Sequence, residues 1–113
     1  MKMSRNDWHN FKKDIIEAIE STGDTVEDIE AVKILNELDG TYNGEDPRDI
    51  AAKPYREKLI SWAIAAPILD YEYDSGFGGM DCHDIRIWTK DNIFYIHEYD
   101  GSTSVYSMSR NPE

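Results

Sequence analysis

The dipeptide Asp100-Gly101 constrains the fold more than any other feature of the sequence. It separates two short runs rich in aromatic and β-branched residues, 93–99 and 102–108. Asp-Gly accepts the positive φ angles of a two-residue hairpin turn, whose twist matches that of paired strands. The sequence therefore predicts that these two runs form an antiparallel β-hairpin.

Two further runs of the same character precede the hairpin. Residues 68–73 and 82–89 are predicted to be strands, and the tripeptide Lys90-Asp91-Asn92 supplies a turn before the run at 93–99. Connections this short make neighbouring strands antiparallel. We therefore expect a four-stranded antiparallel meander over residues 67–113.

The first part of the chain has helical periodicity instead. Ser4 is a candidate N-cap for a helix that begins at Arg5 and ends near Ser21–Gly23. Apolar residues recur on one face of this predicted helix: Trp8, Phe11, Ile15 and Ile19. The pattern predicts an N-terminal helix that packs by this face.

Two more helices are expected before the meander. Thr25 caps a predicted helix over 25–39, with Asp28 at its third position. Asp46-Pro47 indicates a cap and first-turn proline for a short helical turn. A third helix is expected from Pro54 to Ala66, ended by Pro67, although 55–66 also fits a buried strand. The expected architecture is one α+β domain, 1–113, with helices of 1–66 packed on one face of the meander.

Cysteine content and hydropathy restrict the environment of the chain. Cys82 is the single cysteine, which excludes an intrachain disulfide and favours a reducing compartment such as the cytoplasm. The longest apolar run, 62–69, is interrupted by Pro67 and is too short to cross a bilayer. No signal-peptide pattern is present at the N-terminus. We expect a cytoplasmic protein with no membrane partner.

The charge of the chain restricts its partners. Twenty-three acidic residues oppose 12 lysines and arginines, for a net charge of −11, and residues 23–74 alone carry −8. A nucleic-acid binder needs cations to displace the counterions around phosphate, so no direct nucleic-acid ligand is expected. The same field attracts basic protein surfaces. The plain alternative is that the acidity only keeps a small protein soluble.

The stretch 70–88, DYEYDSGFGGMDCHDIRIW, holds the densest set of reactive side chains. Cys82 and His83 are neighbours on a predicted strand and point to opposite faces, so they are poorly placed as a nucleophile and its base. For the same reason at most two residues of 81–84 reach one metal ion, unless His97 on the next strand joins His83, assisted by Asp81 or Glu98. No catalytic residue, cofactor or metal site is predicted.

The glycines of this stretch do not form a phosphate-binding loop. No lysine or arginine lies between Lys58 and Arg86, and the glycines precede a strand, not a helix. We interpret the stretch as a turn carrying carboxylates and exposed aromatic rings, which makes a protein-binding surface with the acids of the middle segment. The predicted binding residues are Glu27, Asp28, Glu30, Glu45, Asp46, Asp70, Glu72, Tyr73, Asp74, Phe77, Asp81 and Asp84.

The segments YEYDSGFGG, IRIW and EYDGSTSVYSMSRNP resemble short proteins of bacteriophages and mobile elements, in which a Gly-rich turn precedes a hairpin closed by Tyr-Asp-Gly. In size, acidity and lack of a catalytic motif the chain is similar to anti-CRISPR and anti-restriction inhibitors. The resemblance implies a non-catalytic DNA mimic in the cytoplasm of a bacterial host, which occupies the basic groove of a defence nuclease such as a Cas effector. An immunity protein that neutralises a basic toxin is the second hypothesis, and a small metal-dependent enzyme is the third.

Overall fold

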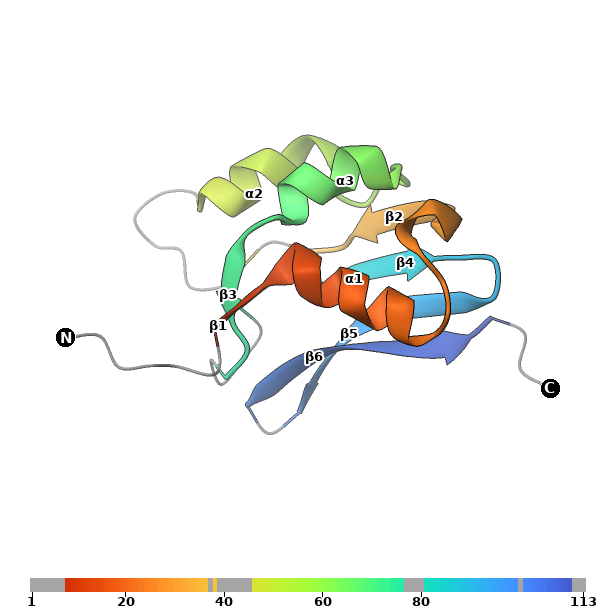
Figure 1. The fold of residues 1–113 in the computed structure, drawn as a ribbon. Helices are drawn as coiled ribbons and strands as arrows, with labels where there is room; N and C mark the ends of the chain where they lie inside the picture. The colour runs from red at the N-terminus through yellow and green to blue at the C-terminus, as the bar shows by residue number, and fades with distance from the viewer. Residues whose placement is uncertain (1–7, 37, 39–45, 77–80, 100, 111–113) are drawn as a thin grey trace.

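The computed structural model describes residues 8–36, 38, 46–76, 81–99 and 101–110. These residues form helices and two antiparallel sheets, so the predicted α+β class is confirmed (Figure 1). The helices are α1 (Phe11–Ser21), α2 (Pro47–Ala52) and α3 (Trp62–Leu69). The strands are β1 (Trp8–Asn10), β2 (Ala31–Ile34), β3 (Glu72–Asp74), β4 (Ile85–Trp88), β5 (Asn92–Tyr99) and β6 (Ser102–Ser109).

The larger sheet has the order β2-β4-β5-β6. The predicted hairpin is confirmed, because β5 and β6 pair antiparallel from Tyr99 opposite Ser102 to Asn92 opposite Ser109. Gly101 has φ +84°, a conformation that glycine adopts without strain. The strand predicted at 82–89 is confined to β4, and the described residues just before Ile85 lie in neither a helix nor a strand.

The prediction of a helix over 25–39 is wrong in its described part. Val26–Asp28 is a single 3₁₀ turn, closed by a capping box between Thr25 and Asp28, and β2 follows at once. In β2 the buried Val32 and Ile34 alternate with the half-buried Lys33, which is the period of a strand. Pairing with β4 therefore overrides the helical interpretation of the same apolar residues.

A second, two-stranded sheet joins the start of the chain to the segment after α3. β1 pairs antiparallel with β3, with Trp8 opposite Asp74 and Asn10 opposite Glu72. Ser4 and Arg5 lie outside the described residues, and the helical prediction is wrong for Trp8–Asn10 because these residues form β1. α1 begins after Asn10, whose side chain accepts the Lys13 N–H at 2.9 Å. Of the predicted strand 68–73, residues 68–69 belong to α3 and residues 72–73 belong to β3, which pairs with β1 outside the larger sheet.

The region 54–66 combines the two alternatives that the sequence left open. Of the expected helix from Pro54 to Ala66, residues 62–66 are α-helical and Lys53–Tyr55 is a 3₁₀ turn, so no continuous helix begins at Pro54. Ile60 instead forms an antiparallel bridge with Val32, and the Ser61 side chain then accepts the Ile64 N–H at 3.2 Å and caps α3. Pro67 does not end α3, which continues to Leu69. The short α2 follows Asp46-Pro47 as predicted.

The core lies between α1 and the inner face of the larger sheet, with α2 and α3 beside β2 (Figure 1). Phe11, Ile15 and Ile19 of α1 are fully buried against inward residues of the strands. Within the described ranges, none of the helices is long and apolar enough to cross a membrane. The largest fully buried side chains are Tyr73, Phe11, Phe94, Ile15, Ile19, Ile34, Leu69, Ile85, Ile87, His83, Val32 and Thr89.

Candidate functional site

A hollow of about 420 Å³ lies beside the small sheet and collects several of the predicted binding residues. It is lined by Trp8 of β1, Arg48 of α2, Glu72 and Asp74 of β3, and Asp81 before β4. We call this hollow the acidic groove. Trp8 is 41% exposed and Glu72 is exposed, so both are accessible to a partner.

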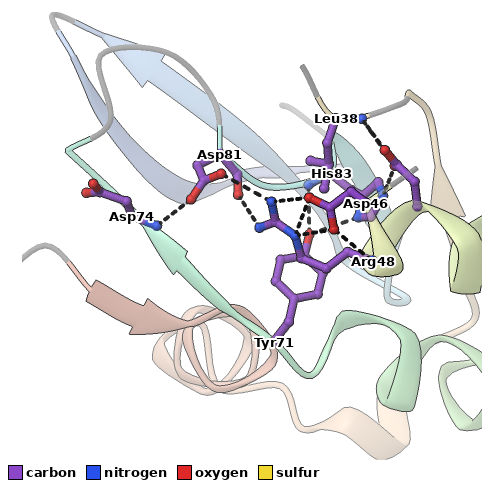
Figure 2. Close-up of polar contacts among 8 residues, drawn as sticks. Leu38, Asp46, Arg48, Tyr71, Asp74, Asp81 and His83 are labelled. Carbon is purple, nitrogen blue, oxygen red and sulfur yellow. Dashed lines mark hydrogen bonds and ion pairs between the residues drawn. The ribbon is translucent and has the colours of Figure 1, made fainter. Parts of the chain in front are cut away.

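Arg48 is the centre of the contacts around the acidic groove (Figure 2). Its guanidinium donates to Asp46 at 2.8 Å, to the Asp81 carbonyl at 2.9 Å and to the Asp81 carboxylate at 3.3 Å. The same group lies 4.9 Å from the centre of the Tyr71 ring. The hydrogen bond from Arg48 lowers the pKa of Asp46, which stays ionised. Both carboxylates are therefore fixed in position by one cation.

The second oxygen of Asp81 joins this cluster to β3. It accepts the Asp74 N–H at 2.9 Å (Figure 2). Asp74 itself is 7% exposed, and its carboxylate accepts the Gly76 N–H at 2.9 Å. Asp74 was expected on the surface, and this expectation is wrong because its side chain is used to close the turn after β3.

His83 forms a second polar cluster beneath the groove. Its Nδ1 lies 2.8 Å from the Tyr71 hydroxyl, and its Nε2 lies 2.9 Å from Asp49. The Asp49 carboxylate also accepts the Leu38 N–H at 3.1 Å. Because an ionised carboxylate only accepts hydrogen bonds, the ring proton of His83 lies on Nε2, which donates to Asp49. The Tyr71 hydroxyl then donates to Nδ1 and accepts the backbone N–H of His83. Burial lowers the pKa of His83 and keeps the ring neutral, although Asp49 acts in the opposite direction.

The reactive residues of the sequence are not gathered into one accessible site. Cys82 is fully buried, and burial raises the pKa of its thiol. His83 is also fully buried, whereas His97 stacks on Tyr106 of β6 with ring centres 4.4 Å apart. Among the described residues, no group of three or more histidine, cysteine or acidic side chains is placed to hold a metal ion. The geometry of the groove suits recognition by ordered carboxylates.

The predicted binding residues divide into two groups at opposite ends of β4. Glu27, Asp28 and Glu30 lie near its C-terminal end, where the Glu30 N–H donates to the Trp88 carbonyl. Asp28 belongs to the capping box, and Glu30 forms an ion pair of 2.7 Å with Arg110. The acidic groove lies near the other end of β4. The structure therefore does not join the acids of 27–30 to those of 70–84.

The remaining predicted residues have individual roles. Asp70 is exposed, and the hydrogen bond from Asn10, aided by Lys12, lowers its pKa. Asp84 lies 3.2 Å from Arg86. Glu45 and Phe77 lie outside the described residues.

Tyr73 was expected as an exposed aromatic anchor, and this expectation is wrong. It is 1% exposed and packs against Phe11, with ring centres 5.3 Å apart. Its hydroxyl donates to Asp14 of α1 at 2.7 Å. Burial, together with this contact, raises the pKa of Tyr73. The ring is part of the core, and the accessible aromatic side chain of the groove is that of Trp8.

Trp8, Arg48 and Asp49 were not among the predicted site residues. Arg48 follows the Asp46-Pro47 cap directly, so its contact with Asp46 had a local signal in the sequence. The contacts of Arg48 with Asp81 and of Asp49 with His83 join residues 33 and 34 positions apart, and no local pattern marks them. Comparison of the chain with protein-family models, with curated proteins and with solved structures finds no match.

Proposed function

We propose that the protein is a non-catalytic, anti-CRISPR-like inhibitor that binds the basic nucleic-acid groove of a host defence nuclease as a DNA mimic. The observation that carries this proposal is the cluster at the acidic groove. Asp46 and Asp81 both pair with the guanidinium of Arg48, and Glu72 and Asp74 line the same hollow as Arg48 and Asp81. The cluster keeps a negative charge at fixed positions, as a phosphate backbone does.

Preorganisation makes this cluster a better ligand for cations than the same acids on free side chains. Asp46 and Asp81 are already held by hydrogen bonds, so binding costs little further side-chain entropy. Complementary charge also speeds the encounter with a basic surface. Trp8 offers an accessible ring at the rim, on which a lysine or arginine of the partner can pack.

The environment of the reactive side chains supports a binding role. A nucleophilic cysteine needs an accessible thiolate, whereas Cys82 is enclosed and its pKa is raised. His83 uses both ring nitrogens in contacts with Tyr71 and Asp49. These groups stabilise the fold around the groove and leave its carboxylates to meet a partner.

The proposal is tested by displacement of a fluorescent DNA duplex from a purified Cas effector. Wild-type protein is expected to displace the duplex, with an affinity that falls as salt rises. Glu72→Lys is expected to weaken displacement by about tenfold. Glu27→Lys, with the same charge change at the other end of β4, is the matched control and is expected to act like wild type. Asp74 is left unchanged because it is buried.

Two results would contradict the proposal. Displacement that does not depend on salt or on Glu72→Lys would exclude charge mimicry at the acidic groove. Displacement from a basic nuclease toxin, but not from a Cas effector, would assign the chain to the immunity proteins instead.

A further inference from the structure

The outer edge of the larger sheet is unusual for so acidic a chain. β6 is the last strand in the sheet order, and its eight residues, STSVYSMS, include no charge and no proline. Natural proteins protect exposed sheet edges with charged residues, prolines or bulges, because an unprotected edge pairs with other strands. β6 pairs with β5 in an unbroken register and has none of these protections.

The direction of the backbone groups on this edge follows from one hydrogen bond. The Thr103 N–H points away from β5 and donates to the Ser75 carbonyl at 2.8 Å. Backbone groups alternate along a strand, so those of Val105 and Ser107 point to the same outer side. No described strand lies there. These two residues therefore present N–H and C=O groups to an incoming strand.

A groove runs beside this edge, between β6 and α1. It has a volume of about 330 Å³. Its α1 side includes Asp14, Glu17 and Ala18, and its β6 side includes Thr103 and Val105. We call it the edge groove. A strand added to β6 would place alternate side chains toward α1, where two carboxylates face them.

The edge groove continues toward the acidic groove. A third hollow, of about 350 Å³, shares Asp14 and Glu17 with the edge groove and shares Trp8 and Glu72 with the acidic groove. It also includes Lys13, so three acids and one lysine are among its lining residues. An extended segment that leaves β6 can therefore pass toward the acidic groove over a surface on which three acids outnumber one lysine.

We infer that the β6 edge docks an extended segment of the basic partner, which adds a strand to the sheet and places lysine or arginine side chains against Asp14 and Glu17. This inference rests on the proposed function, because it takes the basic partner from there. Main-chain hydrogen bonds at Val105 and Ser107 hold the segment, and the carboxylates select its charge. A second copy of β6 fits the groove less well, since that strand has no cation to offer.

The test uses synthetic peptides of about eight residues, a common strand length, that alternate threonine with lysine or with glutamate. The lysine peptide is expected to shift the amide resonances of Val105 and Ser107 and to slow their hydrogen exchange at least about tenfold. The glutamate peptide should do neither. Because no nuclease is present, this result does not depend on whether the proposed function holds.

Two pairs of variants separate backbone pairing from charge. Ser107→Pro removes an outward N–H and is expected to abolish the exchange protection, whereas Ser107→Thr keeps this N–H and the protection. Glu17→Lys is expected to weaken the lysine peptide at least about fivefold, while Glu20→Lys, a matched change on the same helix outside the groove, leaves its affinity unchanged.

Three results would overturn the inference. Equal binding of both peptides at these amides would remove the charge selection. Shifts confined to the acidic groove would show that the edge is not used, and would leave the proposed function intact. Protection of Val105 and Ser107 that rises with protein concentration in the absence of peptide, and is lost in Ser107→Pro, would identify a second copy as the occupant.

Discussion

The two edges of the larger sheet, β2 and β6, differ in how many of their outward backbone groups are hydrogen-bonded. At β2, the Val32 N–H donates to Ile60 at 2.8 Å, and Ile60 donates back at 2.9 Å, so a connecting segment covers the edge. The Glu57 N–H adds a bond of 2.7 Å to Ile34. At β6, the Thr103 N–H donates to the Ser75 carbonyl at 2.8 Å, at one end of the strand.

The difference shows that residues 57–60 stabilise the β2 edge of the sheet. The closed edge is covered by 57–60 and lies beside α2 and α3, and both backbone groups of Val32 and the Ile34 carbonyl are paired there (Figure 1). The open edge is formed by the most regular hairpin of the fold, which needs no cover to keep its register. An edge left open in this way is available to a partner.

Breaking the closed edge should have the largest effect on stability. Ile60→Pro removes a buried side chain and the N–H that bonds Val32, so it is expected to lower the free energy of unfolding by about 3 kcal/mol or more. Ser107→Pro, the equivalent change on the open edge, should cost less than about 1 kcal/mol. Urea denaturation measures both, and equal losses would contradict the distinction between the edges.

The helices beside the closed edge should be the next most sensitive part. The ring of His83 contacts Asp49 of α2 and the Tyr71 hydroxyl. His83→Ala therefore removes one hydrogen-bond partner from each of these side chains in a buried cluster. The expected loss is about 2–3 kcal/mol in the free energy of unfolding. Hydrogen exchange should accelerate at the Ile60 amide and remain unchanged at β6 amides that pair with β5. Equal acceleration at both edges would show that His83 supports the whole sheet.

Acidification should lower the free energy of unfolding through His83, which lies next to α2 at the closed edge. Since the pKa of folded His83 lies below about 6.5, its ordinary value, the unfolded chain binds more protons between these two pKa values. Stability is therefore expected to fall as pH drops below about 6.5, by at most about 1.4 kcal/mol per pH unit, and to be flat for this group above it. Urea midpoints at several pH values test the slope. An unchanged slope in His83→Asn would assign it to other groups.

The smallest effect is expected at the ion pair between residues that flank β2 and β6. The ion pair between Glu30, before β2, and Arg110, after β6, lies at the surface. Arg110→Ala should cost about 1 kcal/mol or less, mainly through loss of the bond to the Thr89 carbonyl, and Glu30→Gln still less. Thermal unfolding at low and high salt measures both. A large, salt-dependent loss would show that the two edges are coupled through this pair.

The C-terminal elements were the most predictable part of the fold. Strands β5 and β6 follow from alternating residues on either side of Asp100-Gly101, because both the turn and the register are local properties. The Asp46-Pro47 cap of α2 and the box between Thr25 and Asp28 are also local, and both were identified. The strand after Thr25 was not identified, because Val32 and Ile34 show its period over only four residues and its pairing with β4 is a tertiary contact.

The candidate site was predictable in composition but not in arrangement. The acids of 70–84 were identified as a surface, yet Asp74 is buried, and the division of the acidic residues along β4 depends on tertiary pairing. Tyr73 was assigned to the surface because the pairing of β3 with β1 was not foreseen. Arg48, which orders the groove, contacts residues distant in the sequence, and no local pattern marks these contacts.

The pairing of β1 with β3 has a consequence for the order of folding. It joins residues more than sixty positions apart through only three residues on each strand, whereas β4, β5 and β6 are sequential neighbours. Closing so long a loop gains few contacts until α1 and α3 are in place. We expect the three sequential strands to form the nucleus and the small sheet to be completed last, so that Trp8, at the rim of the acidic groove, reaches its position in the final step. Substitutions in β1 should then accelerate unfolding and leave the folding rate nearly unchanged, which stopped-flow measurements would show.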